Sequence, residues 1–252
     1  MHNKIHIIWY DELDSTNSEA LRHISSFANL SVLGAVNQTA GRGQRGNTWH
    51  AAPGENLTFS MVLKFGPSGL PPLRADRQFR ISQAATLGLL DFLAEEAISC
   101  TVKWPNDVYA GRKKISGMLV ENVLDGEYVS ASVVGIGLNV NQRDFPPALV
   151  NPTSMACQTH ERYDIKTLLP RLCALLGRRF EALEDEDACT SLMQEYVDSL
   201  FQLGTPHDYV ECATAETFSG TIVGVTPAGR LLLQPADGPL RTYAFKEVSY
   251  LI

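Results

Sequence analysis

Two short segments hold most of the residue types that could do chemistry. Residues 41–49, GRGQRGNTW, place three glycines and two arginines in front of a tryptophan. Glycines let backbone N–H groups approach an anion, arginines pair with phosphate or carboxylate, and an indole stacks on a flat base. Residues 103–107, KWPND, set a cation, an amide and a carboxylate around a turn stiffened by proline. Together the two segments predict an active site that uses a nucleotide.

The glycine spacing also matches the G-x-G-x-x-G fingerprint of dinucleotide-binding proteins at Gly41, Gly43 and Gly46. That fingerprint needs a helix beginning at the glycines and an acidic residue about 20 positions later. Here residues 47–54 contain helix breakers, and the expected acidic position falls in KFGP, residues 64–67. We interpret the match as coincidental, which argues against an NAD-dependent oxidoreductase.

Composition narrows the class of protein. A chain of 252 residues with 44% hydrophobic content can form one large domain, or a domain and a small appendage. No segment approaches the roughly 20 apolar residues that cross a bilayer, and the first residues lack a signal-peptide core. A net charge of −7 argues against nucleic acid as the main partner. We expect no membrane association.

The cysteines and histidines point away from disulfides and zinc. The five cysteines are odd in number and form no C-x-x-C pair, which is typical of reduced thiols in the cytoplasm. The six histidines are scattered, so no zinc cluster is indicated.

Hydrophobic periodicity predicts a mixture of strands and helices. A helix near Asp14 is expected, with Thr16 and Glu19 spaced as a capping box. Turns at residues 110–112 and 125–126 predict a three-stranded meander, whose edge could pair with a second copy. The expected strands are 5–10, 32–37, 57–65, 101–109, 113–124 and 127–136, and the expected helices are 74–98, 164–184 and 188–202.

The pattern of residue types along the sequence changes after residue 204. Short β-branched runs at 209–213, 217–226, 231–234 and 242–245 alternate with turn residues. This pattern predicts a small β-barrel of about 45 residues that docks on the larger part. We therefore expect a catalytic domain at residues 1–204 and a barrel domain at 205–252.

The sequence resembles the biotin–protein ligases, which activate biotin with ATP and transfer it to a lysine of a carrier protein. The matching pieces occur in family order. They are Ser15-Thr16-Asn17, Gln38, Gly41-Arg42-Gly43, Trp49, residues 103–107, residues 113–121 (KKISGMLVE) and residues 135–139 (GIGLN).

The resemblance implies a fold and a function. The fold would be α+β, a mixed, mostly antiparallel sheet packed by helices (class II synthetase-like), with an SH3-like C-terminal barrel. The substrates would be biotin and ATP with Mg²⁺, and the partner a biotin carboxyl carrier protein. The family includes monomers and homodimers. Because the first catalytic strand begins within ten residues, we expect no DNA-binding repressor domain.

The resemblance also implies roles for individual residues, while metal ligands stay unassigned. The implied catalytic residues are Arg42, Lys103, Asp107 and Lys114. The implied biotin-binding residues are Ser15, Thr16, Asn17, Gln38, Gly41, Arg42, Gly43, Gln44, Lys114, Gly117 and Gly137. The implied ATP-binding residues are Arg42, Trp49, Lys103, Asn106, Lys114 and Asn139.

Each of these residues has an ordinary structural alternative. Ser15 and Thr16 are good helix N-caps, and Trp49 could belong to the core. Residues 103–107 could be a tight turn with a structural salt bridge. Alternation along a strand separates Lys114 from its neighbour Lys113, since adjacent residues face opposite sides.

One departure from the family is Gln44, where members often have another arginine, together with Asn47, where a basic residue is usual. The loop therefore carries less charge, which bears on how tightly it retains the adenylate.

The alternative functions are a lipoate- or octanoate-transferring enzyme on the same fold and a non-catalytic biotin sensor or DNA-bound repressor.

The predicted mechanism addresses an electrostatic problem, because a carboxylate must attack a phosphate. We expect Arg42 and Lys114 to hold the biotin carboxylate against the α-phosphate of ATP. Asp107 is the candidate base for the carrier lysine.

Overall fold

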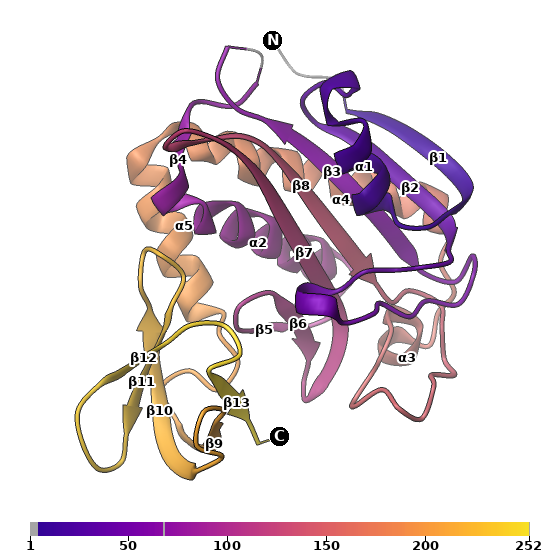
Figure 1. The fold of residues 1–252 in the computed structure, drawn as a ribbon. Coiled ribbons are helices and arrows are strands. Elements are labelled where there is room, and N and C mark those ends of the chain that lie inside the picture. The colour runs from indigo at the N-terminus through magenta and orange to yellow at the C-terminus, as the bar shows by residue number, and fades with distance from the viewer. Residues whose placement is uncertain (1–4, 68, 252) are drawn as a thin grey trace.

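The computed structural model describes residues 5–67 and 69–251, apart from the side chain of Arg45. It contains an eight-stranded sheet and a separate five-stranded sheet (Figure 1). The larger sheet has the order β1-β2-β3-β8-β7-β6-β5, with β4 added to β8. Only β1 and β2 pair in parallel among these strands. The prediction of a mixed, mostly antiparallel sheet is confirmed.

The elements around the larger sheet have the following bounds. The strands are β1 (His6–Leu13), β2 (Ser31–Gln38), β3 (Leu57–Lys64), β4 (Leu73–Arg74), β5 (Thr101–Lys103), β6 (Asp107–Ala110), β7 (Lys113–Asp125) and β8 (Tyr128–Leu138). The helices are α1 (Thr16–Arg22), α2 (Phe79–Glu95), α3 (Met155–Thr159), α4 (Ile165–Glu181) and α5 (Glu186–Asp198). Short 3₁₀ turns lie at Ile24–Ser26, Gln44–Gly46, Ala75–Arg77 and Ala182–Glu184.

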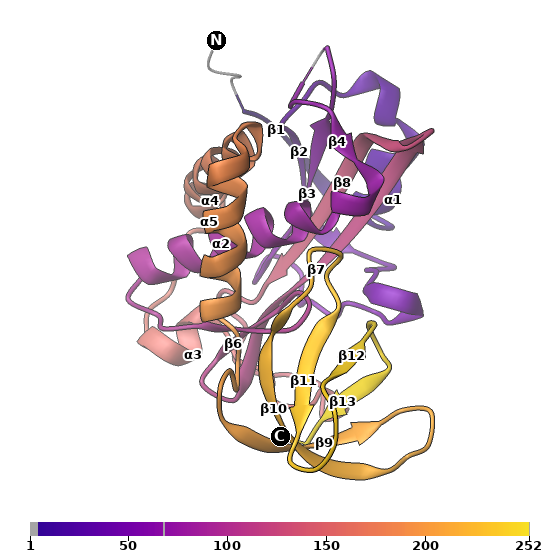
Figure 2. The same cartoon turned by 90° about the vertical axis from the view of Figure 1, so that its left-hand side faces the viewer.

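Helices cover both faces of the larger sheet unequally. Figure 2 shows α2, α4 and α5 together on one side and α1 on the other. Helix α2 buries Ile81, Leu89 and Phe92 completely in the main core. It is shorter than the expected 74–98, because Leu73 and Arg74 pair with β8 instead of continuing the helix.

The meander is confirmed in its hairpins and corrected in its first strand. Gly111 and Gly126 take the left-handed backbone that two-residue hairpin turns require. The expected strand 101–109 is two strands, β5 and β6. Pro105 has no N–H to donate to a sheet ladder, so the chain turns there.

The cap of α1 differs from the predicted capping box. Ser15 is the N-cap, and its hydroxyl accepts the backbone N–H of Ser18. The hydroxyl of Thr16 donates to Gln38 instead, at 3.2 Å, and Glu19 pairs with Arg22. The box is therefore wrong by one residue, because Thr16 is occupied by a partner from another element.

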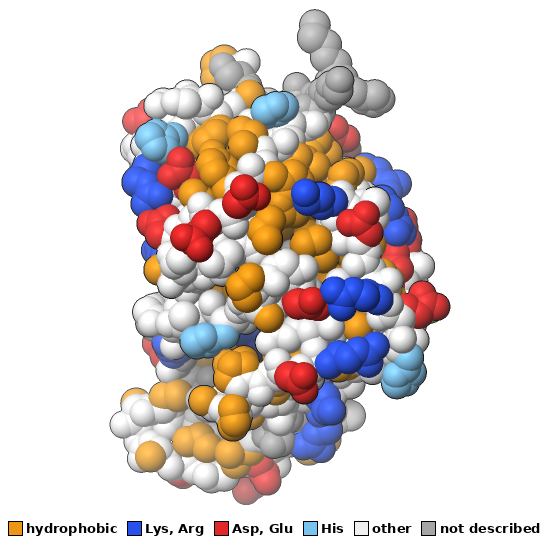
Figure 3. All heavy atoms as spheres, turned by 90° about the vertical axis from the view of Figure 1, so that its right-hand side faces the viewer, with side chains coloured by type: hydrophobic (Ala, Val, Ile, Leu, Met, Phe, Trp, Pro, Cys, Tyr) orange, Lys and Arg blue, Asp and Glu red, His pale blue; other side chains and the backbone are white. Residues whose placement is uncertain are grey.

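The two edges of the larger sheet differ in accessibility. At the edge of the meander, Val102 of β5 exchanges backbone hydrogen bonds of 2.8 Å with Ser199 and Phe201. That segment covers the edge at Val102, and pairing of copies through the meander stays a prediction. At the other edge, β1 pairs with β2 alone among the described strands. Figure 3 views the molecule from this side and shows apolar side chains gathered on its upper part.

The C-terminal sheet is antiparallel, in the order β12-β11-β10-β9-β13. Its strands are β9 (Pro206–Glu211), β10 (Thr217–Val225), β11 (Leu231–Pro235), β12 (Arg241–Tyr243) and β13 (Val248–Tyr250). The first four overlap expected strands, whereas β13 was not expected. The division into domains at residue 204 stays a prediction.

The C-terminal sheet docks on the turn between β5 and β6. The indole N–H of Trp104 donates to the carbonyl of Gly229 at 2.9 Å, and its ring meets Phe245 edge-on. Behind the turn, the hydroxyl of Tyr196 donates to the carbonyl of Pro105 at 2.6 Å. The KWPND turn is thus held from both sides.

Two further observations bear on the class of protein. Among the described residues, no helix combines the length and apolarity needed to cross a membrane. All five cysteines carry free thiols, as predicted.

We predict that Trp104→Phe lowers the free energy of unfolding by about 0.5–1.5 kcal/mol, because the partly buried carbonyl of Gly229 loses its hydrogen bond from the indole. Urea denaturation measures the change. The control is Trp9→Phe in β1, since the indole of Trp9 donates to no other described residue. Equal losses in the two variants would contradict the docking role.

Candidate active site

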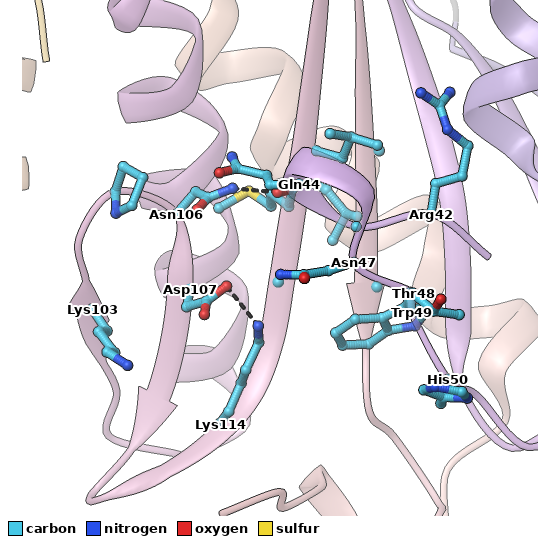
Figure 4. A pocket seen from close by; sticks show the side chains of 18 of the residues that line it. Arg42, Gln44, Asn47, Thr48, Trp49, His50, Lys103, Asn106, Asp107 and Lys114 are labelled. Carbon is cyan, nitrogen blue, oxygen red and sulfur yellow. Dashed lines mark hydrogen bonds and ion pairs between the residues drawn. The ribbon is translucent and has the colours of Figure 1, made fainter. Parts of the chain in front are cut away.

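A cavity of about 700 Å³ lies where the glycine loop (residues 41–49), the strands β6–β8 and the C-terminal sheet meet. Its lining includes the loop residues 42–44 and 47–50, the KWPND turn and residues 245, 246 and 248–250. Such a volume suits one drug-sized ligand or two small ones in contact. Figure 4 shows Lys103, Asp107 and Lys114 on one side of it, opposite Asn47 and Trp49.

The structure brings most of the predicted site residues to this cavity. Gly41 and Asn139 are not among its lining residues. The lining residues include Ser15, Thr16, Asn17, Gln38, Arg42, Gly43, Gln44, Trp49, Lys103, Asn106, Asp107, Lys114, Gly117 and Gly137.

Lys114 and Asp107 form an ion pair inside the cavity, with 2.7 Å between Nζ and Oδ1. The pair lies where β6 and β7 begin. A Cβ at Gly117 would come within 3.1 Å of Nζ and 3.2 Å of Oδ1, so glycine leaves the room that the pair occupies. Lys113 is exposed outside the cavity, which agrees with strand alternation.

Trp49 packs on the floor of the cavity. Its indole lies where a side chain at Gly137 would be, so only glycine admits it there. The amine of Lys114 lies 5.8 Å from the centre of the indole ring. Asn106 is fixed beside them by a hydrogen bond from its amide to the carbonyl of Met118.

Gly41 and Asn139 lie behind the cavity wall. A Cβ at Gly41 would approach the carbonyl oxygen of Trp49 to 2.5 Å, so this glycine is required by the fold of the loop. Asn139 donates from Nδ2 to the carbonyl of Thr153 at 2.9 Å. Its buried Oδ1 has no partner among the described residues, and neither does the indole N–H of Trp49.

A buried polar network forms the end of the cavity near α1. Gln38 Oε1 accepts the backbone N–H of Thr16 at 2.7 Å. The hydroxyl of Ser60 lies 2.7 Å from that of Thr16 and donates to Asn17 Oδ1 at 2.5 Å. Sequence reasoning missed Ser60, although a serine in the apolar run LTFSMVLK of β3 was a visible signal.

Arg42 is bound to a carboxylate that sequence reasoning did not assign to the site. Its guanidinium donates to Glu121 through Nη1 at 3.0 Å and Nη2 at 2.7 Å. Figure 4 shows the guanidinium pointing away from the Lys114–Asp107 pair. Arg42 and Lys114 thus share a cavity, but here they face different partners.

Lys103 is a partly buried cation between two aromatic rings. Its amine lies 5.4 Å from the ring centre of Tyr109 and 5.2 Å from that of Tyr250. Burial lowers the pKa of Lys103 below its ordinary 10.5, and the nearby Asp107 opposes this shift. No salt bridge to Lys103 occurs among the described residues, so its charge is available to an incoming anion.

The C-terminal sheet contributes part of the cavity wall. Phe245, Lys246, Val248, Ser249 and Tyr250 line it next to Lys103 and Trp104. Sequence reasoning left the role of this sheet open, and no local pattern places these residues beside residues 103–107.

The charges in the cavity favour anionic ligands. Four cations line it (Arg42, Lys103, Lys114 and Lys246), against Asp107 as the one carboxylate among the described lining residues. Elsewhere in the described part of the chain, no three His, Cys, Asp or Glu side chains gather as a metal site would need. The cavity therefore fits phosphate or carboxylate groups better than a bare metal ion.

Comparison with known proteins identifies the class. The model of the biotin/lipoate A/B protein ligase family matches residues 10–139. The chain is 30% identical to the bifunctional ligase/repressor BirA of Escherichia coli over 241 residues, which are 94% of this chain and 71% of that protein. It is 29% identical to the biotin–[acetyl-CoA-carboxylase] ligase of Paracoccus denitrificans, over 89% of this chain and 92% of the relative.

A solved structure agrees along the whole length. The biotin protein ligase of Aquifex aeolicus, in complex with biotin and ATP, superimposes with a TM-score of 0.78 at 26% identity, covering 97% of both chains. This chain belongs to the biotin/lipoate A/B protein ligase family. Within that family it is a biotin–protein ligase.

We predict that Lys103→Met makes the protein more stable at pH 7. There the wild type holds a partly desolvated charge that methionine lacks. Because the folded-state pKa is lowered, the unfolded chain binds more protons between that pKa and 10.5, and wild-type stability rises with pH in this range. The stability advantage of Lys103→Met over the wild type should therefore shrink as the pH rises toward 10.5.

Urea unfolding at several pH values tests this expectation. Lys113→Met makes the same chemical change outside the cavity and serves as the control. An advantage of Lys103→Met that stays constant up to pH 10.5 would contradict a lowered pKa.

Proposed function

We propose that this enzyme joins biotin to ATP to form biotinyl-5'-AMP and then transfers the biotinyl group to a lysine of a biotin carboxyl carrier protein. The observation that carries the proposal is the meeting of Arg42, Lys103 and Lys114 around one cavity with the polar network of Thr16 and Asn17. The relatives named as ligases of acetyl-CoA carboxylase support the choice of carrier.

In the first step, a carboxylate oxygen of biotin attacks the α-phosphorus and pyrophosphate leaves. Two anions must come into contact, so cations are needed on both sides. Lys114 would leave Asp107 to bind the α-phosphate, and Arg42 would turn from Glu121 to bind the carboxylate. Lys103 would meet the phosphates from the side of the C-terminal sheet.

The nucleotide base would lie near Trp49, whose indole N–H has no partner in the described structure. Asn106, fixed to Met118, would contact the nucleotide from the KWPND turn. The unpaired Oδ1 of Asn139 leaves an acceptor for the amino group of a base. Mg²⁺ would enter as a counter-ion of ATP, held by phosphates and water, since the lining residues form no dedicated metal site.

In the second step, the neutral amine of the carrier lysine attacks the acyl carbon and AMP leaves. The ammonium form of the carrier lysine must lose a proton before it can attack. Asp107, which is paired with Lys114 in the ligand-free cavity, would accept that proton once Lys114 has moved to the phosphate. The biotin ring would occupy the end of the cavity lined by Ser15, Thr16, Asn17 and Gln38. We place the enzyme in the cytoplasm, where its free thiols persist.

The alternative is activation of lipoate or octanoate, because the matching family includes lipoate ligases. We expect pyrophosphate to exchange into ATP when biotin is added, and not when lipoate or octanoate is added instead. Biotin should then appear on a purified carrier domain by mass spectrometry. Exchange with lipoate alone would overturn the proposal in favour of the alternative.

We predict that Lys114→Met lowers biotin-dependent pyrophosphate exchange by a factor of about 100 or more, the size expected when a group that stabilises developing charge is removed. Lys113→Met is the matched control and should exchange at the wild-type rate, since Lys113 is exposed and does not line the cavity. Wild-type exchange by Lys114→Met would remove Lys114 from the mechanism.

A further inference from the structure

Glu121 of β7 binds residues from two separate parts of the site. Its carboxylate accepts both terminal nitrogens of Arg42, at 3.0 and 2.7 Å, and the amide of Asn17 at 2.9 Å. A two-nitrogen contact of this kind fixes the plane of the guanidinium as well as its position. Glu121 therefore joins the glycine loop to the polar end of the cavity.

Asn17 anchors this carboxylate to the cavity end. It is almost fully buried, and its amide also donates to the carbonyl of Leu119 at 3.1 Å. Its Oδ1 accepts the hydroxyl of Ser60, and the absence of a side chain at Gly135 gives it room. Because these contacts fix Asn17, its hydrogen bond holds the Glu121 carboxylate in position beside Arg42.

The ion pair also determines where Arg42 points. Nη1 has Ser18 Oγ as a further neighbour, at 3.4 Å. With both terminal nitrogens engaged, the guanidinium is directed away from Lys114 (Figure 4). A substrate anion between Arg42 and Lys114 must replace Glu121 as the partner of Arg42.

We propose that Glu121 is a positioning residue that holds Arg42 in the ligand-free enzyme and competes with the substrate anion for its guanidinium. This inference rests on the proposed function, since it takes the biotin carboxylate as the competing anion. Competition lowers the apparent affinity for the anion, because part of the binding energy is used to break the existing pair. A residue that only orients Asn17 would have the opposite effect, since its loss would weaken binding.

The test is Glu121→Gln, which keeps an acceptor for Asn17 and the side-chain volume but removes the charge. We expect biotin to bind about three- to five-fold more tightly by calorimetry, the size appropriate to a partly exposed ion pair. Biotinol, in which a neutral alcohol replaces the carboxylate, should bind with unchanged affinity. In an Arg42→Ala background the gain for biotin should disappear.

Glu127→Gln removes one negative charge from the same hairpin, at an exposed side chain that faces Arg74, and controls for net charge. Weaker binding of biotin and biotinol alike would show that Glu121 only orients Asn17. An equal gain for both ligands, or no change for either, would also overturn the proposal.

A second measurement needs no ligand. If Glu121 holds the loop through Arg42, trypsin should cut within residues 41–47 of ligand-free Glu121→Gln faster than in the wild type and in Glu127→Gln. Unchanged cleavage would overturn the proposal even if the wild type bound no biotin, a result that would by itself count against the proposed function. Glu121→Asp, which keeps the charge on a shorter stem, should give a smaller acceleration and replaces Glu121→Gln if that variant unfolds.

Discussion

The pairing of two cavity cations, Arg42 and Lys114, with carboxylates is the constraint on which the site depends. Lys114 is paired with Asp107 and Arg42 with Glu121, at 2.7 Å in both cases. Unpaired cations crowded into one cavity would repel one another and destabilise the folded chain. The carboxylates allow the cavity to hold these two cations without a ligand, and in the proposed mechanism they are the partners that substrate anions replace.

The fold brings these pairs together from distant parts of the sequence. Strand β7 carries Lys114 at its start and Glu121 further along, so one element fixes a member of each pair. Strand β6 supplies Asp107 through direct pairing with Gly117, and the loop after β2 supplies Arg42. The relative positions of the two pairs are therefore set by the neighbouring strands β6 and β7 and by the loop after β2.

The sequence was sufficient for features that are local. The hairpin turns, the KWPND turn and the glycine loop could be predicted, because their residue types constrain the backbone within a few positions. Glu121 could not be assigned a role, since its charge acts on Arg42 only after β7 and the loop are brought together. For the same reason, nothing local indicated that Tyr250, near the end of the chain, would lie against Lys103.

The partial exposure of the two pairs would allow their cations to change partners in the proposed mechanism. Side-chain exposure is 42% for Arg42 and 24% for Glu121, and 31% and 30% for Lys114 and Asp107. Ion pairs open to water contribute little net stability, whereas fully buried pairs are strongly destabilised when one member leaves. In the proposed mechanism Arg42 moves from Glu121 to the ligand, and Gln44 and Asn47 in the same loop add no charge of their own. An anion that bridges Arg42 and Lys114 draws both cations at once, which a single anion bound to either alone does not.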